Sequence, residues 1–110
     1  MKLNIVLKAI DEKKAENIVA YDFEELNPSI DKVIICSASN HRQVHAIADN
    51  IEYRLKEQGY EINHMEGDKN SNWVLVDCDD IIIHVFSYEE RNHYQLEKLY
   101  VGLPCEVINL

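Results

Sequence analysis

Two apolar runs separated by only two residues constrain the fold of this chain more than any other feature. Residues 73–77 and 80–86 are rich in valine and isoleucine, and only Cys78 and Asp79 lie between them. A link of two residues is the length at which antiparallel strands close into a hairpin, so we expect a hairpin here. Both runs are apolar almost throughout, which predicts strands covered on both faces, by helices or by a second subunit.

The rest of the chain alternates between strand-like and helix-like patterns. The expected order is αββαβββαβ, a single α/β domain over residues 1–110 with a mixed, mostly five-stranded sheet and helices packed on it. The strand–helix–strand unit within residues 32–65 favours a parallel, right-handed crossover. The other strands are expected at 18–23, 32–36, 61–65 and 105–110.

Three helices are expected to pack on this sheet. The second begins after Asn40, whose side chain can cap it, and ends at Gly59. The third begins after Ser87, which pairs with Glu90 in a capping box, and a glycine at 102 and a proline at 104 stop it. The expected buried stripes are Leu3, Val6, Leu7 and Ile10 in the first helix and Val44, Ile47, Ala48, Ile51 and Leu55 in the second.

Length and charge narrow the function classes. A chain of 110 residues holds one hydrophobic core and is too short for two ordinary domains. The net charge of −9, from 20 acidic and 11 basic side chains, disfavours direct nucleic-acid binding and favours a basic partner. We find no signal-peptide pattern, no run approaching the roughly 20 apolar residues of a membrane span, and no indication of a cofactor.

The three cysteines contain no C-x-x-C pair. Three buried thiols in a cytosolic protein are therefore the simplest interpretation. They are Cys36, Cys78 and Cys105.

Two histidines four residues apart, His41 and His45, fall on one face of the second helix, which is a spacing that suits zinc. Arg42 stands where a zinc protease needs its glutamate base, so that class is excluded. A structural metal site would need a third ligand; otherwise these are solvated surface histidines. The unplaced candidates for a third ligand are His64, His84 and His93.

His84 also interrupts an apolar strand. If its imidazole is buried, it must find a hydrogen-bond partner. A hydrogen bond in or near the core is one expectation, and a role in binding is the other.

A second constellation has the composition of a nucleotidyltransferase site. The small-residue turn 37–39 precedes a helix and could hold phosphate, while Asp77 with Asp79 or Asp80 could hold magnesium. The turn lacks glycine, and no basic cluster stands near it in sequence, which weakens this interpretation. Asp79 is alternatively the left-handed residue of the hairpin turn.

Trp73, the sole tryptophan, sits where a polar loop enters a strand. A large aromatic side chain edged by carboxylates has the composition of an interface anchor for a basic partner. The alternative for Trp73 is a core position, and the alternative for each carboxylate is solvated surface. The acidic and aromatic set comprises Glu66, Asp68, Trp73, Asp77, Asp80, Glu89, Glu90, Tyr94 and Tyr100.

These residues resemble the ribosomal silencing factors, the RsfS or Iojap-like family, along nearly the whole chain. The pattern is far denser than a single short motif. Its most specific parts are CSASNHRQVHAIAD at 36–49, Glu66-Gly67, the runs 73–77 and 80–86, Glu90-Arg91, Tyr94, and LEKLY at 96–100.

The resemblance implies a cytoplasmic, non-enzymatic factor that binds the large ribosomal subunit through its fourteenth protein. Such a factor blocks joining of the small subunit and lowers translation when nutrients are scarce. The resemblance also implies a homodimer, and a sheet like that of nucleotidyltransferases without their catalytic set. Trp73 would desolvate the centre of the contact while carboxylates orient docking. The expected partner-binding residues are Glu66, Trp73, Asp77, Asp80, His84, Glu90, Arg91 and Tyr94.

The chain departs from the family pattern at three places. The family usually has glycine in the small-residue turn, where this chain has Ala38 or Ser39, and at the hairpin turn, where it has Asp79. Tyr100 stands where tryptophan is common. None of these departures touches residues 73–77, so they bear on turn geometry more than on the expected partner. Besides the nucleotidyltransferase, the alternative function is a dimeric acidic adaptor for another basic protein.

Overall fold

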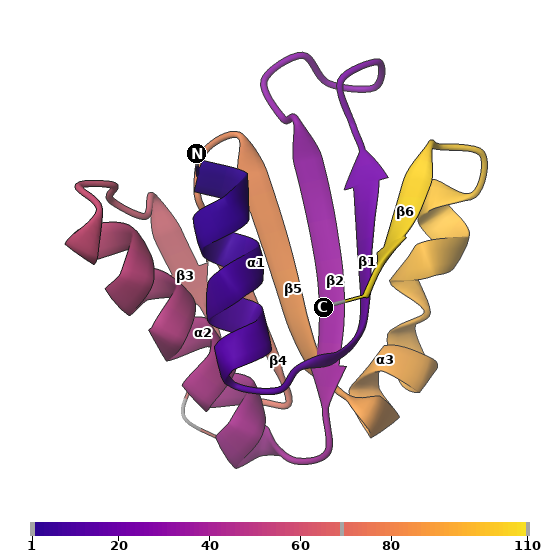
Figure 1. The fold of residues 1–110 in the computed structure, drawn as a ribbon. Coiled ribbons are helices and arrows are strands. Elements are labelled where there is room, and N and C mark those ends of the chain that lie inside the picture. The colour runs from indigo at the N-terminus through magenta and orange to yellow at the C-terminus, as the bar shows by residue number, and fades with distance from the viewer. Residues whose placement is uncertain (1, 69, 110) are drawn as a thin grey trace.

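The computed structural model describes residues 2–68 and 70–109. One mixed sheet carries helices, as expected (Figure 1). The helices are α1 (Lys2–Glu12), α2 (His41–Glu57) and α3 (Tyr88–Tyr94), and a 3-10 helix, η1 (Leu96–Tyr100), follows α3. The strands are β1 (Glu16–Asp22), β2 (Lys32–Ala38), β3 (His64–Glu66), β4 (Trp73–Asp77), β5 (Ile81–Ser87) and β6 (Cys105–Ile108).

The strands form a six-stranded sheet in the order β3-β4-β5-β2-β1-β6. Strands β2 and β5 are parallel neighbours at its centre, and the other neighbouring pairs are antiparallel. The last strand, β6, pairs with β1 at one edge, as expected, and brings the sheet to six strands where a mostly five-stranded one was expected. Strands β2 and β3 run in the same direction, but β5 and β4 lie between them.

The expected hairpin is confirmed as β4 and β5, with Val76 opposite Ile83. Its link is one residue longer than expected because β5 begins at Ile81. Asp79 has a φ of 69°, the left-handed conformation expected of it in the turn.

Helices α1 and α2 lie side by side over one face of the sheet (Figure 1). All five residues expected in the buried stripe of α2 are fully buried, and the side chain of Asn40 caps this helix by accepting the N–H of Gln43. In α1, Val6 and Ile10 are buried, while Leu3 and Leu7 pack partly buried against the same core. This face therefore holds the main hydrophobic core.

The opposite face is covered only in part, so the expectation of strands buried on both faces is wrong for β4. Helix α3 is only seven residues long. The chain then turns at Gln95, which has a φ of 50°, and η1 places the Tyr100 ring 5.1 Å from that of Tyr21 on β1. Because α3 packs on β5 and β2, and the Tyr100 ring of η1 lies against Tyr21 on β1, alternate residues of β4 stay partly exposed.

Three further expectations were wrong in detail. The third helix does not continue to residue 102, because Gln95 ends it in the left-handed conformation and a 3-10 turn follows. The third strand is three residues long, since the chain reaches the sheet only at His64. Cys36 and Cys78 are buried, but Cys105 is exposed because it lies on the edge strand β6.

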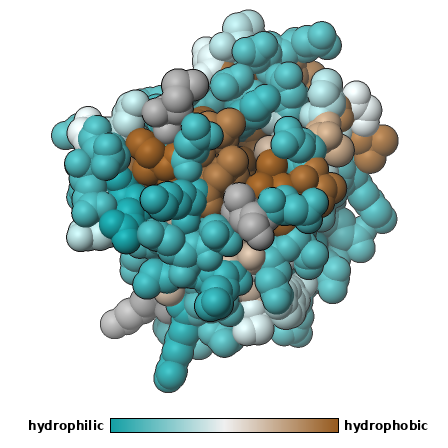
Figure 2. Space-filling model, viewed as in Figure 1, coloured by the Kyte–Doolittle hydropathy of each residue, from teal (hydrophilic) through white to brown (hydrophobic). Residues whose placement is uncertain are grey.

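Figure 2 views the molecule from the helix side and shows hydrophobic residues gathered across its middle within a hydrophilic surround. A groove on this side runs between α1 and β6, and Leu7, Ala20 and Ile108 are among the residues that line it. Among the described residues, none of the helices combines the length and the apolar character that a bilayer span requires.

Candidate partner-binding site

Trp73 lies on the β3–β4 side of the sheet, where α3 and η1 give only partial cover. Paired residues on neighbouring strands project to the same face of a sheet. Trp73 pairs with Phe86, Leu75 with His84 and Asp77 with Ile82. Glu66 on β3 pairs with Leu75 and adds a carboxylate to the same face. We call this surface the open face, defined by Glu66, Trp73, Leu75, Asp77, Ile82 and His84.

Trp73 is neither a fully buried core residue nor a fully exposed interface residue, the two alternatives expected for it. One side of its ring is packed and the other is partly exposed. Its ring stacks on that of Phe86 at 4.9 Å between centroids and meets the Tyr94 ring at 4.8 Å. Tyr94 is half exposed on α3, so the structure brings these two predicted contact residues together. An aromatic cluster with a solvent-facing edge is the composition typical of an interface anchor.

His84 is buried and has the hydrogen-bond partner that its position requires. The indole Nε1–H of Trp73 donates to His84 Nδ1 over 3.1 Å. Since an indole nitrogen can only donate, Nδ1 carries no proton and the neutral ring holds its proton on Nε2. Burial lowers the pKa of His84 to about 4, which keeps the ring neutral and the bond intact. His84 thus holds the Trp73 side chain in place.

The described residues of the loop between β3 and β4 are 67–68 and 70–72, and their contacts hold them against the start of β4 and against α2 and β5. A Cβ atom at Gly67, which has a φ of 127°, would lie 2.9 Å from the carbonyl oxygen of Trp73. His45 Nε2 lies 3.0 Å from the carbonyl oxygen of Ser71 and donates to it, while the N–H of Ser87 donates to the carbonyl of Asn72. His45 therefore anchors this loop, a role that its sequence spacing did not reveal.

The predicted carboxylates divide into two groups. Glu66 lines a hollow on one side of Trp73, together with Gly67 and Leu75. Glu90 lines a second hollow that also contains Trp73, and its other lining residues are Asp68, Asn70, Ser71 and Asn72. Glu89 is exposed beside Glu90 but lines neither hollow.

Asp77 and Asp80 lie at the other end of the hairpin. Asp77 is four residues along β4 from Trp73, about 13 Å at the usual rise of a strand. Its Oδ1 accepts the N–H of Asp79, and its Oδ2 lies 3.4 Å from the Asn63 side-chain amide. Asp80 pairs with Lys2 at 2.9 Å. These two carboxylates hold the turn and the start of α1.

Arg91 faces away from Trp73 as well. Its Nε donates to Glu97 at 2.9 Å, and its Nη1 donates to the carbonyl of Asn17 and to the Ser37 hydroxyl. Arg91 therefore ties α3 to η1 and to the ends of β1 and β2.

The capping box at the start of α3 is half formed. The Ser87 hydroxyl accepts the N–H of Glu90, as expected. The N–H of Ser87 donates to Asn72 instead, so Glu90 is not needed there and lines the hollow.

The structure separates the two halves of the nucleotidyltransferase constellation. In the parallel register of β2 and β5, Lys32 lies opposite Ile81 and Ala38 opposite Ser87. Two of the three residues expected in the small-residue turn, Ser37 and Ala38, are instead the last residues of β2, and only Ser39 follows the strand. The hairpin carboxylates precede the other end of this strand pair, about 20 Å away along the strands. A phosphate at the turn could not share a metal ion with these carboxylates.

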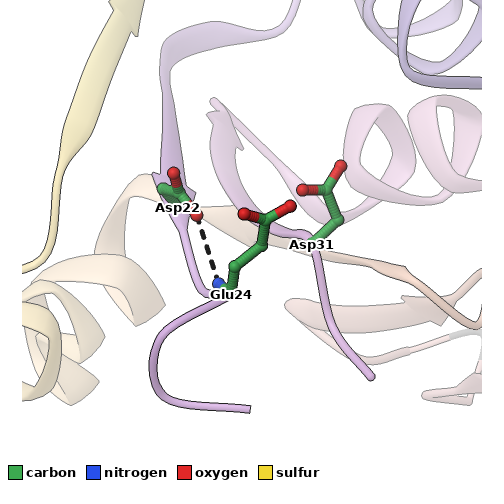
Figure 3. Close-up of side chains that lie close together, drawn as sticks. All are labelled: Asp22, Glu24 and Asp31. Atoms are coloured by element: carbon green, nitrogen blue, oxygen red, sulfur yellow. Dashed lines mark hydrogen bonds between the residues drawn. The ribbon is translucent and has the colours of Figure 1, made fainter. Parts of the chain in front are cut away.

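One group in the described part of the chain brings three possible metal ligands within 4.8 Å of one another, and it contains no histidine (Figure 3). It comprises Asp22, Glu24 and Asp31 at the loop between β1 and β2. Lys32 already lies 4.0 Å from Asp22, and a hydrogen bond with Asp31 raises the pKa of Glu24. The group is thus partly neutralised by its own surroundings.

The sequence of this chain is similar to those of one protein family. A sequence model of the protein family "Ribosomal silencing factor during starvation" matches residues 1–109. A relative from Bacillus subtilis named ribosomal silencing factor RsfS is 41% identical over 102 residues, covering 93% of this chain and 86% of the relative. A relative of the same name from Halalkalibacterium halodurans is 39% identical, covering 93% of this chain and 87% of the relative.

Solved structures agree with this comparison. A crystal structure from Bacillus halodurans has a TM-score of 0.84 and 38% identity, covering 96% of each chain. A crystal structure from Chromobacterium violaceum has a TM-score of 0.86 and 28% identity, covering 99% of this chain and 91% of that one. The expected fold class is confirmed.

The buried His84 predicts a pH-dependent stability. Its folded pKa of about 4 lies below the ordinary 6.5, so the unfolded chain binds the extra proton between these values. The free energy of unfolding should therefore fall as the pH drops from 6.5 to 4, by up to about 3 kcal/mol from this residue. Urea denaturation over this pH range gives the free energy of unfolding of the wild type and of His84→Gln. The difference between the two free energies should become smaller as the pH falls. An unchanged difference would contradict a neutral His84.

The close approach of Gly67 predicts a second effect. Gly67→Ala should lower the free energy of unfolding by roughly 1–3 kcal/mol and change the emission of Trp73, because a methyl group would press on the Trp73 backbone. Gly59→Ala is a matched control, since Gly59 also has a positive φ, of 84°, but nothing lies within 4 Å of its added Cβ. Urea denaturation followed by tryptophan fluorescence compares the two. If Gly67→Ala and Gly59→Ala lose the same free energy of unfolding, the loss comes from backbone strain alone and the close contact with Trp73 adds nothing.

Proposed function

Since the chain belongs to the family of ribosomal silencing factors, we propose that it binds the large ribosomal subunit through that subunit's fourteenth protein. Family membership ties the chain to translation regulation and to ribosome association. In this proposal the bound protein sterically blocks the small ribosomal subunit, so the two subunits cannot join. Translation then falls when nutrients are limiting, and the factor works in the cytoplasm.

The observation that supports this proposal is the open face. It presents the partly exposed Trp73 on the sheet, with Tyr94 of α3 against its ring and carboxylates next to it. The net charge of −9 attracts a basic protein and repels bare RNA phosphates. An aromatic centre with a charged edge is the usual composition of a protein–protein contact.

The mechanism requires no chemical step. The apolar surface of Trp73 and Leu75 loses water on contact, and the neighbouring carboxylates steer the basic partner into register. His84 contributes by fixing the indole before binding, which lowers the conformational entropy lost in the complex. Occupancy of the subunit surface then excludes the other subunit sterically. The names of the curated relatives describe a regulator and no enzyme.

Removal of the indole tests the proposal. Trp73→Ala should weaken binding to large ribosomal subunits by about 2 kcal/mol or more, roughly 30-fold, because the centre of the contact is lost. Co-sedimentation in sucrose gradients, and binding to the purified fourteenth protein, measure the loss. Tyr53→Ala is the matched control, since Tyr53 is an aromatic residue 57% exposed on α2. Unchanged binding by a Trp73→Ala protein with a native circular dichroism spectrum would remove Trp73 from the site.

The homodimer implied by the family resemblance remains part of the proposal. Leu99, Val101 and Val107 are 74%, 80% and 63% exposed, and they belong to the η1 and β6 end of the molecule (Figure 1). A second copy that covers them leaves the open face available to the ribosome. Sedimentation velocity should show twice the mass of one chain, and Val107→Asp should halve it. Leu26→Asp, at a residue 64% exposed in the loop between β1 and β2, should have no effect.

A further inference from the structure

Trp73 stands between two separate hollows of the surface. Glu66 and Leu75 line the first with it, and we call this the Glu66 hollow. Asp68 and Glu90 line the second with it, and we call this the Glu90 hollow. In each hollow, Trp73 forms part of the wall and at least one carboxylate lies beside it.

The carboxylates of the hollows differ from the other acids of the hairpin in what they do for the fold. Asp77 is engaged by the turn backbone and by Asn63, and Asp80 is paired with Lys2. Glu66 has one exposed histidine, His64, at 2.8 Å from its Oε1. This contact joins two exposed residues of one short strand, so it holds no distant element of the fold in place.

One wall of the Glu90 hollow is the Asp68 carboxylate, which local hydrogen bonds hold in place. Asp68 Oδ1 accepts the backbone N–H of Asn70 at 2.9 Å and the hydroxyl of Ser71 at 3.1 Å. These bonds hold the pKa of Asp68 below its ordinary value. The same loop is anchored to α2 through His45 and to β5 through Ser87. The hollow therefore exists before any partner arrives.

The spacing of these carboxylates suits separate organic cations better than one metal ion. In the described residues, the hollows supply no set of three ligand atoms within 4.8 Å of one another, unlike the loop between β1 and β2. A lysine or arginine side chain needs an apolar wall for its methylene stem and an acceptor for its charged end. Trp73 provides the wall in both hollows, and Leu75 extends it in the first.

We propose that the two hollows beside Trp73 are subsites for two basic side chains of the partner protein, one lysine or arginine in each. This deepens the proposed function and rests on it, because the partner is the basic protein that the open face binds. The Glu90 hollow is the stronger subsite, since it supplies two carboxylates where the Glu66 hollow supplies one. Asp77 and Asp80 contribute little to binding.

Charge-neutral variants test the assignment without altering side-chain size. Glu66→Gln should weaken binding to the purified fourteenth protein about fivefold, and the pair Asp68→Asn with Glu90→Gln about tenfold or more. Both should make binding less dependent on salt. Glu89→Gln is the matched control for Glu90, because both residues lie in the first turn of α3 and only Glu90 lines a hollow. Glu61→Gln, an exposed residue before β3, is the control for Glu66.

The outcomes separate the two proposals. Losses at the hollow residues with both control variants binding like the wild type support the subsites. If the hollow variants bind like their controls while the wild type binds well, the subsites are overturned and the proposed function stands. If the wild type binds neither the purified protein nor large subunits, both proposals are overturned. Melting temperatures within about a degree or two of the wild type show that these surface changes leave the fold intact.

Discussion

Helical coverage of the sheet is the constraint on which the rest of this structure depends. Helices α1 and α2 cover most of one face, and their apolar stripes supply most of the core. The other face has only the seven residues of α3 and the short η1, which pack on β5, β2 and β1. The hairpin strands must be apolar on the helix side, and on the open face they expose the side chains that a partner can reach.

The hydrogen bond between Trp73 and His84 meets two requirements of this surface at once. An exposed tryptophan has conformational freedom that binding must remove, and a buried histidine is costly without a partner. The bond satisfies the histidine and restrains the indole at the same time. Stacking on Phe86 supports the same orientation from below. The site is thus prepared by groups that belong to the hydrophobic core.

Contacts of the described loop residues, 67–68 and 70–72, orient the edge of the site in the same way. Gly67 permits the loop to approach the start of β4 more closely than any side chain would allow. His45, 26 residues away in sequence, accounts for the position of Ser71. The carboxylates around Trp73 are therefore held by local bonds, while Asp77 and Asp80 serve the turn at the far end.

Much of the fold could be predicted from the sequence because its signals are local. The hairpin, the buried stripe of α2, the cap at Asn40 and the left-handed Asp79 each depend on residues within a few positions of one another. The density of family-like residues also indicated the class of function. The break at Gln95 and the exposure of Cys105 could not be predicted, since both depend on how the last segment packs on the sheet.

The candidate site was predictable only in its centre. Trp73, Tyr94, Glu66 and Glu90 share a surface as the sequence suggested, and the alternation along β4 exposes the first of them. By itself the sequence determined which residues are apolar, which are charged and the order of the helices and strands. Only the tertiary structure decided that Asp80 pairs with Lys2, that Arg91 ties α3 to β1, and that His84 accepts from Trp73. These pairings join residues far apart in the chain, so the geometry of the packed sheet, and no local pattern, selects them.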